Sequence, residues 1–462
     1  MHDSTLTSQL VERLRGMIDD GLLAPGARMR SLRDAAREEG VSKNTMVEVY
    51  ERLVALGQLD ARPGAGFFVR GTLRTAAERP AHVAEAVDVV SLLREQLEQQ
   101  YEVRIGDGRL PPAWLAGTER MLSIRSTRAA EEVETDHGYG SPWGYAPLRE
   151  RIALLLAERS IRVRTPQILL TQGANHALDL IVRHLLRPQD PVLVDSPGYY
   201  PLFGKLKLAQ VRLVGVRRGA DGPDLDDLVA KAAQHRPKVF FTQCFGHNPT
   251  GGAIGLSTAH RLLQIASQHD FLVVEDDPFA DLMATSLPRL AALDQLERVL
   301  YVGSFSKTLS ASLRVGYVAT HPALAAELRD LKMVTSVSTS DYVERVVHRL
   351  IVRGHYRRHV RRLSARLQTA EADAIDALER VGLRVRTGSG GGYYLWAELP
   401  DGVDEQRLTR FAAERGIFLA PGSVFRVDKR DDEHALRINV AYATDRRFLA
   451  FLREQLQASR TK

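Results

Sequence analysis

Cysteine is almost absent from this chain of 462 residues, which has Cys244 alone. One cysteine excludes an intrachain disulfide, and the scattered histidines lack the spacing of a zinc site, so we expect neither disulfides nor a bound metal. Long apolar runs are also lacking, since no stretch approaches the roughly 18 residues of a membrane span. The amphipathic N-terminus has no apolar core of a signal peptide. We therefore expect a cytoplasmic protein without a membrane anchor.

A strong excess of one charge is missing as well. The net charge is +6, and 44% of the residues are hydrophobic and 26% charged, which is ordinary for a soluble globular protein of two or three domains. Residues 1–75 carry nearly equal numbers of basic and acidic side chains. An anionic partner is permitted, but any contact with nucleic acid must depend on where single basic residues lie.

The first 70 residues have the pattern of a small helical domain. Apolar residues at helical spacing predict a helix over residues 6–20. Ser31 is expected to cap a short helix, and Ser42 to cap a third helix that ends before Gly57. The stretch QLDARPGAGFFV then predicts a β-hairpin. The order is helix, turn, helix and wing.

The start of the second helix of such a motif meets bases and phosphates. Small hydroxyls and a lysine can bind phosphate there, and asparagine can read adenine. Glycines at the tip of the wing let the backbone approach a duplex closely. Taken alone, the same residues also fit a helix cap with a solvated charge. The candidate DNA contacts are Ser42, Lys43, Asn44 and Thr45 in the helix and Gly64 and Gly66 in the wing.

The stretch GARMRSLRDAAREEGVSKNTMVEVYERLVALGQLDARPGAGFFV resembles the winged helix of GntR-type bacterial regulators. The resemblance implies DNA contacts at Arg33, at Ser42 to Thr45 and at the wing glycines. The family usually has Leu-Pro-Ser where this chain has Met29, Arg30 and Ser31. Loss of the proline loosens this turn, whereas Arg30 can add a phosphate contact.

Three segments follow from these patterns: a DNA-binding domain at residues 1–70, a linker at 71–98 and one large domain at 99–462. The linker is polar and rich in alanine, with a weak helical period in its second half. It has too few apolar residues for a core of its own, so we expect a partly helical connection.

Beyond residue 105, short β-branched runs alternate with helical stretches. The runs QILLTQG, PVLVDSPG, KVFFTQC, FLVVEDD and RVLYVGS show no alternation of polar residues. Such runs separated by helices predict an α/β fold whose parallel sheet is covered on both faces. Functional groups of these folds gather at the carboxyl ends of the strands.

Several candidate residues lie at the ends of the expected strands. Gly173, Ala174 and Asn175 precede a helix, where free N–H groups and the helix dipole favour a phosphate. The ring of Tyr199 can stack on a flat heteroaromatic ligand, and Asn248 can direct its amide into the site. Each of them alone also fits an ordinary turn or a packed side chain.

A lysine and a group of acids complete the set. Lys307 can form a Schiff base with an aldehyde, and Ser304 and Arg314 nearby can hold a phosphate. A buried carboxylate among Glu275 to Asp277 can keep a pyridine nitrogen protonated. Arg437 can bind a carboxylate. The alternatives are the Ser-x-x-Lys motif of a serine acylase for Lys307, a solvated loop for the acids and a structural ion pair for Arg437.

In order and spacing these motifs, together with GGYYLW, resemble class I aminotransferases of fold type I over about residues 100 to 455. The resemblance implies pyridoxal 5′-phosphate bound covalently at Lys307, with Asp276 at the ring nitrogen and Asn248 near the ring hydroxyl. It also implies that Tyr199 stacks on the ring and that Arg437 holds the α-carboxylate of an amino acid. The phosphate would be held by Ser304, Ser306, Arg314 and the loop of Gly173, Ala174 and Asn175.

Two departures from the resemblance concern function. Close relatives usually have a tyrosine two or three residues after the aspartate, where this chain has Pro278 and Phe279. Without that donor the phenolate form of the cofactor is less stabilised, which spares imine formation but disfavours efficient transamination. Ala174 also replaces a hydroxyl residue that is often found in the phosphate loop.

Winged helix, linker and aminotransferase-like domain in this order resemble the MocR/GabR-like branch of the GntR regulators. The resemblance implies a homodimeric transcriptional regulator that binds double-stranded operator DNA. It would sense a small amino effector, or pyridoxal phosphate itself, through an aldimine at Lys307. The alternative is a catalytically active aminotransferase that carries a DNA-binding module, and Phe279 favours the sensor. Retention of Lys307, Asp276, Asn248 and Arg314 argues against a regulator that has lost the cofactor.

Overall fold

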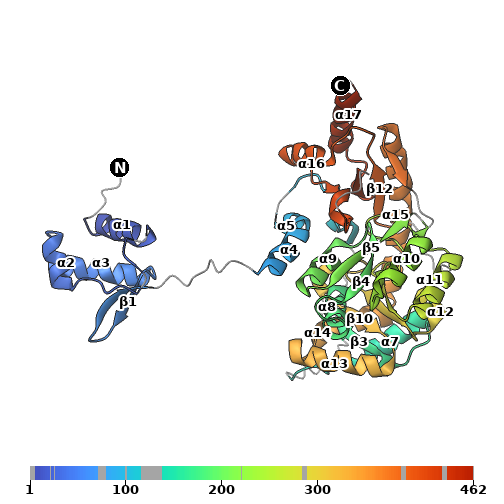
Figure 1. The fold of residues 1–462 in the computed structure, drawn as a ribbon, viewed down its shortest axis with the longest axis horizontal. Helices are drawn as coiled ribbons and strands as arrows, with labels where there is room; N and C mark the ends of the chain where they lie inside the picture. Colours follow the sequence, from blue (N-terminus) through green and yellow to red (C-terminus); the bar gives the residue numbers. More distant parts are fainter. Residues whose placement is uncertain are drawn as a thin grey trace, which may run out of the picture. The chain divides into compact units, whose positions relative to one another are not determined.

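A computed structural model describes residues 6–20, 22–24, 26–70, 80–98, 101–115, 138–219, 221–282, 289–386, 392–428 and 434–460. The chain divides into two compact units, Met1–Pro80 and Ala81–Lys462 (Figure 1). Each unit has a hydrophobic core of its own, so the two are described separately.

The first unit is the expected winged helix. Its helices bury an apolar stripe that includes Met46, Val49 and Leu53 of the third helix. Both expected caps are confirmed, since Ser31 Oγ accepts from the N–H of Asp34 and Ser42 Oγ from that of Thr45. The elements are α1 (Leu6–Asp19), α2 (Leu32–Glu38), α3 (Lys43–Ala55), β1 (Leu59–Arg62) and β2 (Gly66–Val69), and the two strands pair antiparallel.

The expected linker over residues 71–98 is too long. Residues 71–79 lie outside the described part of the chain, but α4 (Ala81–Val89) and α5 (Ser91–Glu98) belong to the second unit. Helix α4 packs against α9 (Tyr200–Leu208).

A glycine explains this contact between α4 and α9. A Cβ atom on Gly204 of α9 would lie 2.8 Å from Val90 Cγ1 and 3.2 Å from the carbonyl oxygen of Ala86. Small side chains on one helix and a glycine on the other let the two backbones approach closely. A segment with few large apolar residues can therefore pack on a neighbour, which its composition alone does not reveal.

The second unit is built on an eight-stranded mixed sheet. Strands β4, β7, β8 and β9 are mutually parallel as expected, and β5, which was not among the predicted runs, is parallel to β4. Strand β10 runs antiparallel to β3 and β9. The order across the sheet is β3 (Ile168–Thr171), β10 (Gly316–Ala319), β9 (Val299–Ser304), β8 (Leu272–Asp277), β7 (Val239–Thr242), β4 (Pro191–Ser196), β5 (Arg212–Gly219) and β6 (Gly222–Pro223).

Helices cover both faces of this sheet. Along β9, Val299 and Tyr301 belong to one core, and Leu300 and Val302 belong to the other. Figure 1 shows α8 and α9 on one side and α10, α11 and α12 on the other. The helices are α7 (Ala146–Ala157), α8 (Ala174–Leu185), α10 (Leu225–His235), α11 (Leu256–Gln268), α12 (Leu290–Asp294), α13 (Pro322–Ser336), α14 (Asp341–Val352) and α15 (His355–Arg380).

A smaller antiparallel sheet follows α15. Its strands lie in the order β11 (Arg384–Arg386), β12 (Tyr394–Glu398), β14 (Ala435–Asn439) and β13 (Ala420–Pro421). Helices α16 (Glu405–Glu414) and α17 (Arg446–Arg460) accompany it. The short 3₁₀ turns are η1 (Thr165–Gln167), η2 (Ala311–Leu313) and η3 (Gly422–Phe425).

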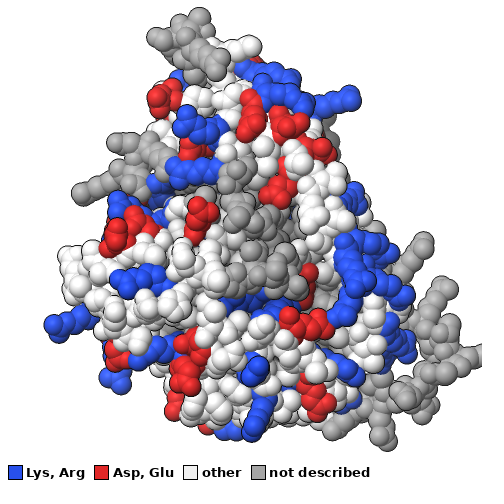
Figure 2. Space-filling model, turned by 90° about the vertical axis from the view of Figure 1, so that its right-hand side faces the viewer, with Lys and Arg blue, Asp and Glu red and all other residues white. Residues whose placement is uncertain are grey.

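Surface charge is distributed unevenly. On the face drawn in Figure 2, basic side chains gather in several groups with acidic side chains between them. Within the described residues, no helix is long and apolar enough to cross a membrane, and no group of three or more histidine, cysteine or acidic side chains is arranged to hold a metal.

Candidate functional site

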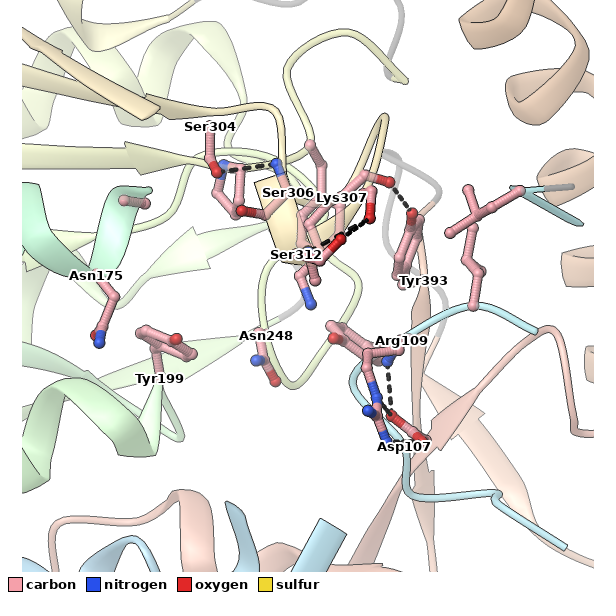
Figure 3. A pocket seen from close by; sticks show the side chains of 18 of the residues that line it. Asp107, Arg109, Asn175, Tyr199, Asn248, Ser304, Ser306, Lys307, Ser312 and Tyr393 are labelled. Carbon is pink, nitrogen blue, oxygen red and sulfur yellow. Dashed lines mark hydrogen bonds and ion pairs between the residues drawn. The ribbon is translucent and has the colours of Figure 1, made fainter. Parts of the chain in front are cut away.

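A cavity of about 640 Å³ lies at the carboxyl ends of β7, β8 and β9 (Figure 3). The N-terminus of α8, the segment before β12 and residues 104–115 also contribute to its wall. Most of the predicted ligand-binding residues line it, although they come from distant parts of the sequence: Ala174, Asn175, Tyr199, Asn248, Asp276, Ser304, Ser306, Lys307 and Arg314.

Lys307 follows the end of β9 and is half-buried. Its Nζ donates a hydrogen bond to the carbonyl oxygen of Gly108. The hydroxyl of Tyr393 donates to the carbonyl oxygen of Lys307, and Nζ lies 6.0 Å from the centroid of that tyrosine ring. The amine is therefore held inside the cavity by the Gly108 carbonyl, and the Tyr393 side chain holds the backbone of Lys307.

The three acids at the end of β8 are all buried and have different partners. Glu275 accepts from the N–H groups of Leu290 and Ala291 at the start of α12. Asp277 accepts from Arg289 Nε and the Tyr301 hydroxyl, both at 2.8 Å. Because side chains alternate along a strand, these two point away from the cavity and Asp276 points into it. The alternative of a solvated acidic loop is wrong.

Asp276 has one carboxylate oxygen paired and one unpaired. Its Oδ2 accepts from Gln243 Nε2 at 2.7 Å, whereas its buried Oδ1 has no hydrogen-bond partner among the described residues. Burial raises the pKa of Asp276 to about 7, against the opposing hydrogen bond from Gln243. An unpaired buried carboxylate oxygen is costly, so a bound group that donates a proton here would be stabilised.

Gln243 is a cavity-lining residue that the sequence analysis does not predict. Besides donating to Asp276, its Oε1 accepts from the backbone N–H of Asn248 at 2.9 Å. It therefore fixes Asn248 and Asp276 relative to one another. The available signal was a lone amide side chain at the end of the apolar run KVFFTQC. Its two partners are separated in sequence, so the pattern alone could not identify them.

Several groups suited to an anion lie where α8 begins. Gly173 has a φ of 76°, and a Cβ atom there would lie 3.0 Å from Arg314 Nη2. Arg314 Nη2 donates to the carbonyl oxygen of Gln172 at 2.9 Å. Ser304 Oγ accepts from the N–H of Ser306, whose own buried hydroxyl has no partner in the described part of the chain. A helix N-terminus, a guanidinium and a free hydroxyl thus converge at one end of the cavity.

The predicted DNA contacts lie at the surface of the first unit. Arg33, Ser42, Lys43 and Asn44 are exposed, and Thr45 is half-buried. Ser42 Oγ is occupied by capping α3. Among the wing glycines, Gly64 has a φ of 75° and Gly66 a φ of 103°.

Two exposed arginines in or beside the wing are not among the predicted DNA contacts. The guanidinium of Arg62 lies 4.3 Å from the centroid of the Phe68 ring, and that of Arg28 lies beside Gly66. Arg28 comes from a preceding loop that pairs with Phe68, a contact without a local sequence signal.

Two protein-family models match the chain. The model for bacterial regulatory proteins of the gntR family matches residues 6–69, and the model for aminotransferase class I and II matches residues 101–453. The chain belongs to the MocR/GabR-like branch of the GntR regulators. Its large domain is a fold-type I aminotransferase domain.

Similar proteins have the same organisation or the same large domain. The HTH-type transcriptional regulator TauR of Rhodobacter capsulatus is 28% identical over 462 residues, 93% of this chain and 92% of TauR. The probable rhizopine catabolism regulatory protein MocR of Rhizobium meliloti is 27% identical over 435 residues, 91% of this chain and 87% of its own. The structure of LysN, an alpha-aminoadipate aminotransferase from Thermus thermophilus complexed with N-(5'-phosphopyridoxyl)-L-leucine, has a TM-score of 0.70 at 29% identity, covering 82% and 97% of the two chains.

Pyridoxal phosphate is the cofactor of this MocR-type regulator, and the cavity fits it. The unpaired Asp276 Oδ1 suits a protonated ring nitrogen, and the Ser306 hydroxyl and the start of α8 suit the phosphate. Lys307 Nζ faces the same cavity. The fit thus depends in part on Asp276 Oδ1 and the Ser306 hydroxyl, which have no hydrogen-bond partner among the described residues.

Arg437 of the regulator lies on β14 as expected but is not among the residues that line the cavity. It is almost fully buried behind Tyr394, whose ring centroid is 4.6 Å from the guanidinium carbon. Its Nη1 donates to Asn248 Oδ1 at 3.0 Å, and its Nη2 donates to the Gly106 carbonyl oxygen. Its buried Nε has no hydrogen-bond partner among the described residues, so this N–H is the group left for a ligand carboxylate.

Phe279 lies three residues after Asp276, at the edge of the cavity. Its ring packs against Tyr393 and Tyr394, with centroids 4.8 and 5.9 Å away. Those tyrosines donate their hydroxyls to the Lys307 and Gly108 carbonyl oxygens. The regulator therefore supplies no hydroxyl from the Phe279 position.

The segment before α7 was also missed. Arg109 donates from Nε and Nη2 to the two oxygens of Asp107, each at 3.1 Å, and both residues line the cavity (Figure 3). Asn439 Nδ2 donates to the carbonyl oxygens of Asp107 and Arg109 at 2.8 Å. These contacts join residues more than 300 positions apart, so no local pattern indicates them.

Proposed function

We propose that this regulator binds operator DNA through its winged helix and senses an amino compound in the cavity of its large unit. Pyridoxal phosphate, when bound, supplies an aldehyde carbon and an electron-withdrawing ring. The observation that supports this proposal is the unpaired Asp276 Oδ1 in the same cavity as Lys307 Nζ. A carboxylate and an amine placed so are the two groups that the cofactor requires at its ring nitrogen and its aldehyde.

Lys307 has two alternative partners in this proposal. It would hold the cofactor covalently, and when an effector amine takes its place, Nζ can donate to the Gly108 carbonyl as it does in the structure. Gly108 N–H in turn donates to Gln96 Oε1 of α5 at 3.2 Å. Effector binding would thus change a contact next to the helices that follow the inter-unit connection. A ligand shifts a protein only through such differential contacts.

Other residues have proposed binding roles. Tyr199 would stack on the ring, and Asn248 would lie near the ring hydroxyl. Arg437 would hold an effector carboxylate, for which its Nε is without a partner among the described residues. The proposed phosphate ligands are Ser304, Ser306, Arg314 and the loop of Gly173, Ala174 and Asn175.

The proposed DNA contacts are Arg33, Ser42, Lys43, Asn44 and Thr45, with Gly64 and Gly66 of the wing. We further propose a cytoplasmic homodimer, because paired half-sites of an operator match the two-fold symmetry of a dimer.

A second candidate function is transamination, which the nearly complete aminotransferase lining favours. Phe279 weighs against it, since no hydroxyl from that position reaches the cavity. Turnover separates the two functions. An enzyme converts an amino donor and a keto acid repeatedly, whereas a sensor stops at binding or at a slow half-reaction.

The test is the visible absorption spectrum of the purified protein before and after borohydride reduction. Wild type with cofactor should show a band that borohydride converts into a stable adduct, and Lys307→Ala should show none. Lys43→Ala serves as the matched control, because it removes an exposed lysine of the winged helix and should retain the band while weakening operator binding. Absence of the band from wild type would refute the cofactor role of Lys307.

A further inference from the structure

The first three turns of α15 present an arginine-rich surface. Residues 345–370 contain eight arginines and no aspartate or glutamate. Between residues 357 and 366, every exposed position except Ala365 is an arginine. We call Arg353, Arg357, Arg358, Arg361 and Arg362 the arginine face; all five are exposed.

Intramolecular partners account for little of this charge. Arg357 forms an ion pair with Glu158, and both side chains are more than half exposed. Arg358 contacts His355 Nδ1 at 2.9 Å. Arg353, Arg361 and Arg362 have no ion-pair partner in the part of the chain that the structure describes. The face is therefore a largely uncompensated group of cations.

Helix α15 is an unfavourable place for these cations. Arg357 and Arg361, and likewise Arg358 and Arg362, are four residues apart, a spacing at which like charges destabilise a helix. The first turn of α15 contains Arg357 and Arg358 and no acidic residue. Cations there also face the positive end of the helix dipole. An anionic partner would offset both effects.

The opposite side of α15 contacts the cofactor-binding segment. The hydroxyl of Tyr356 donates to Thr308 Oγ1 at 3.0 Å, and its ring packs against Phe305 at 5.5 Å. Thr308 follows Lys307 directly. Helix α15 thus carries four of the five residues of the arginine face on its exposed side, Arg353 lies just before it, and its buried side supports the lysine segment.

We propose that the arginine face binds the phosphate backbone of double-stranded DNA. This inference depends on the proposed function as an operator-binding regulator and adds a second contact, located on the aminotransferase-like unit. Guanidinium groups bind phosphate oxygens with two parallel hydrogen bonds, and a rigid helix holds them in a fixed row. This contact depends on the phosphate charge and not on the base sequence, so it strengthens binding to any duplex.

The test measures full-length protein binding to a duplex without operator sequence at several salt concentrations. The variant replaces Arg357, Arg358, Arg361 and Arg362 with glutamine, which is also a good helix former. The slope of log affinity against log salt should fall by about 0.9 for each phosphate contact removed, a total of about 2 to 4. The same variant should unfold at a higher temperature, because the like-charge repulsion is relieved.

A matched control removes the same charge elsewhere in the large unit. Arg380, Arg384, Arg410 and Arg453 are also exposed, and the first two have acidic neighbours, Asp376 and Glu398. Their glutamine variant should keep the wild-type salt slope. Equal slopes for the two variants, or dissociation of an oligomer by the arginine-face variant alone, would overturn the inference. If the wild-type protein binds no DNA at all, both the proposed function and the inference fail. If Lys43→Ala loses its preference for the operator while the arginine-face variant behaves as wild type, only the inference fails.

Discussion

Asp276 is buried, and only one of its two carboxylate oxygens has a hydrogen-bond partner among the described residues, which affects the stability of the fold. Burial raises its pKa from 3.8 to about 7. Between pH 3.8 and about 7, the folded protein retains a proton at Asp276 that the unfolded chain has lost. The free energy of unfolding therefore decreases as the pH rises through this range. Glu275, whose pKa burial raises from 4.5 to about 7, contributes a loss of the same sign.

Asp276→Asn should remove the Asp276 part of this loss. We expect cofactor-free wild type and variant to have similar stability near pH 4 and the variant to be more stable at pH 8. Roughly three pKa units correspond to at most about 4 kcal/mol, at about 1.4 kcal/mol per unit. Urea unfolding at both pH values measures the difference. Equal stability at pH 8 would show that the carboxylate is not penalised by burial.

Single residues differ in how far the sequence could predict them. Asp276, Lys307 and Arg314 follow strand ends or lie in a recognisable motif, so their place in the cavity was predictable. The position of Arg437 on a strand was predictable too, but its hydrogen bonds to Asn248 and Gly106 were not, because they join three distant segments. Gln243 was missed for the same reason.

Local signals and long-range packing contribute differently to the helices. The helices of the first unit were predictable because Ser31 and Ser42 cap them and apolar residues recur at helical spacing. The sequence predicts a linker where α4 and α5 lie, because α4 packs against α9, which is more than 100 residues away in the chain. The reversed direction of β10 had no local signal either.

The contact between α4 and α9 should depend on Gly204. In Gly204→Val, the new side chain would overlap Val90 and approach the Ala86 carbonyl, so the two helices must separate. Overpacking of this kind costs about 1 to 3 kcal/mol, and the midpoint of denaturant unfolding should fall accordingly. Gly219→Val is the control, since among the described residues, its chain neighbours aside, no atom lies within 4 Å of the added Cβ atom. A similar loss in both variants would mean that close approach at Gly204 is not the cause.

At the scale of the whole molecule, the two units should unfold separately. Each has its own core, and the division between them lies at Pro80. We expect calorimetry to show two unfolding transitions. Pyridoxal phosphate should raise the midpoint temperature of the large unit's transition and leave the other unchanged. A ligand at a hundred times its Kd stabilises its site by about 2.7 kcal/mol. Lys307→Ala should weaken this shift, and a single transition that moves with cofactor would contradict independent units.

The chain passes between the two units once, at the boundary next to Pro80. All residues that line the cavity lie after this point, and all predicted base-contacting and wing residues lie before it. One recombination event at that position can therefore join a different DNA-reading module to the same sensing domain without cutting through either core. In such a chain, the operator that is bound and the effector that is sensed can change independently during evolution. An existing response to an effector can thus be directed to new genes.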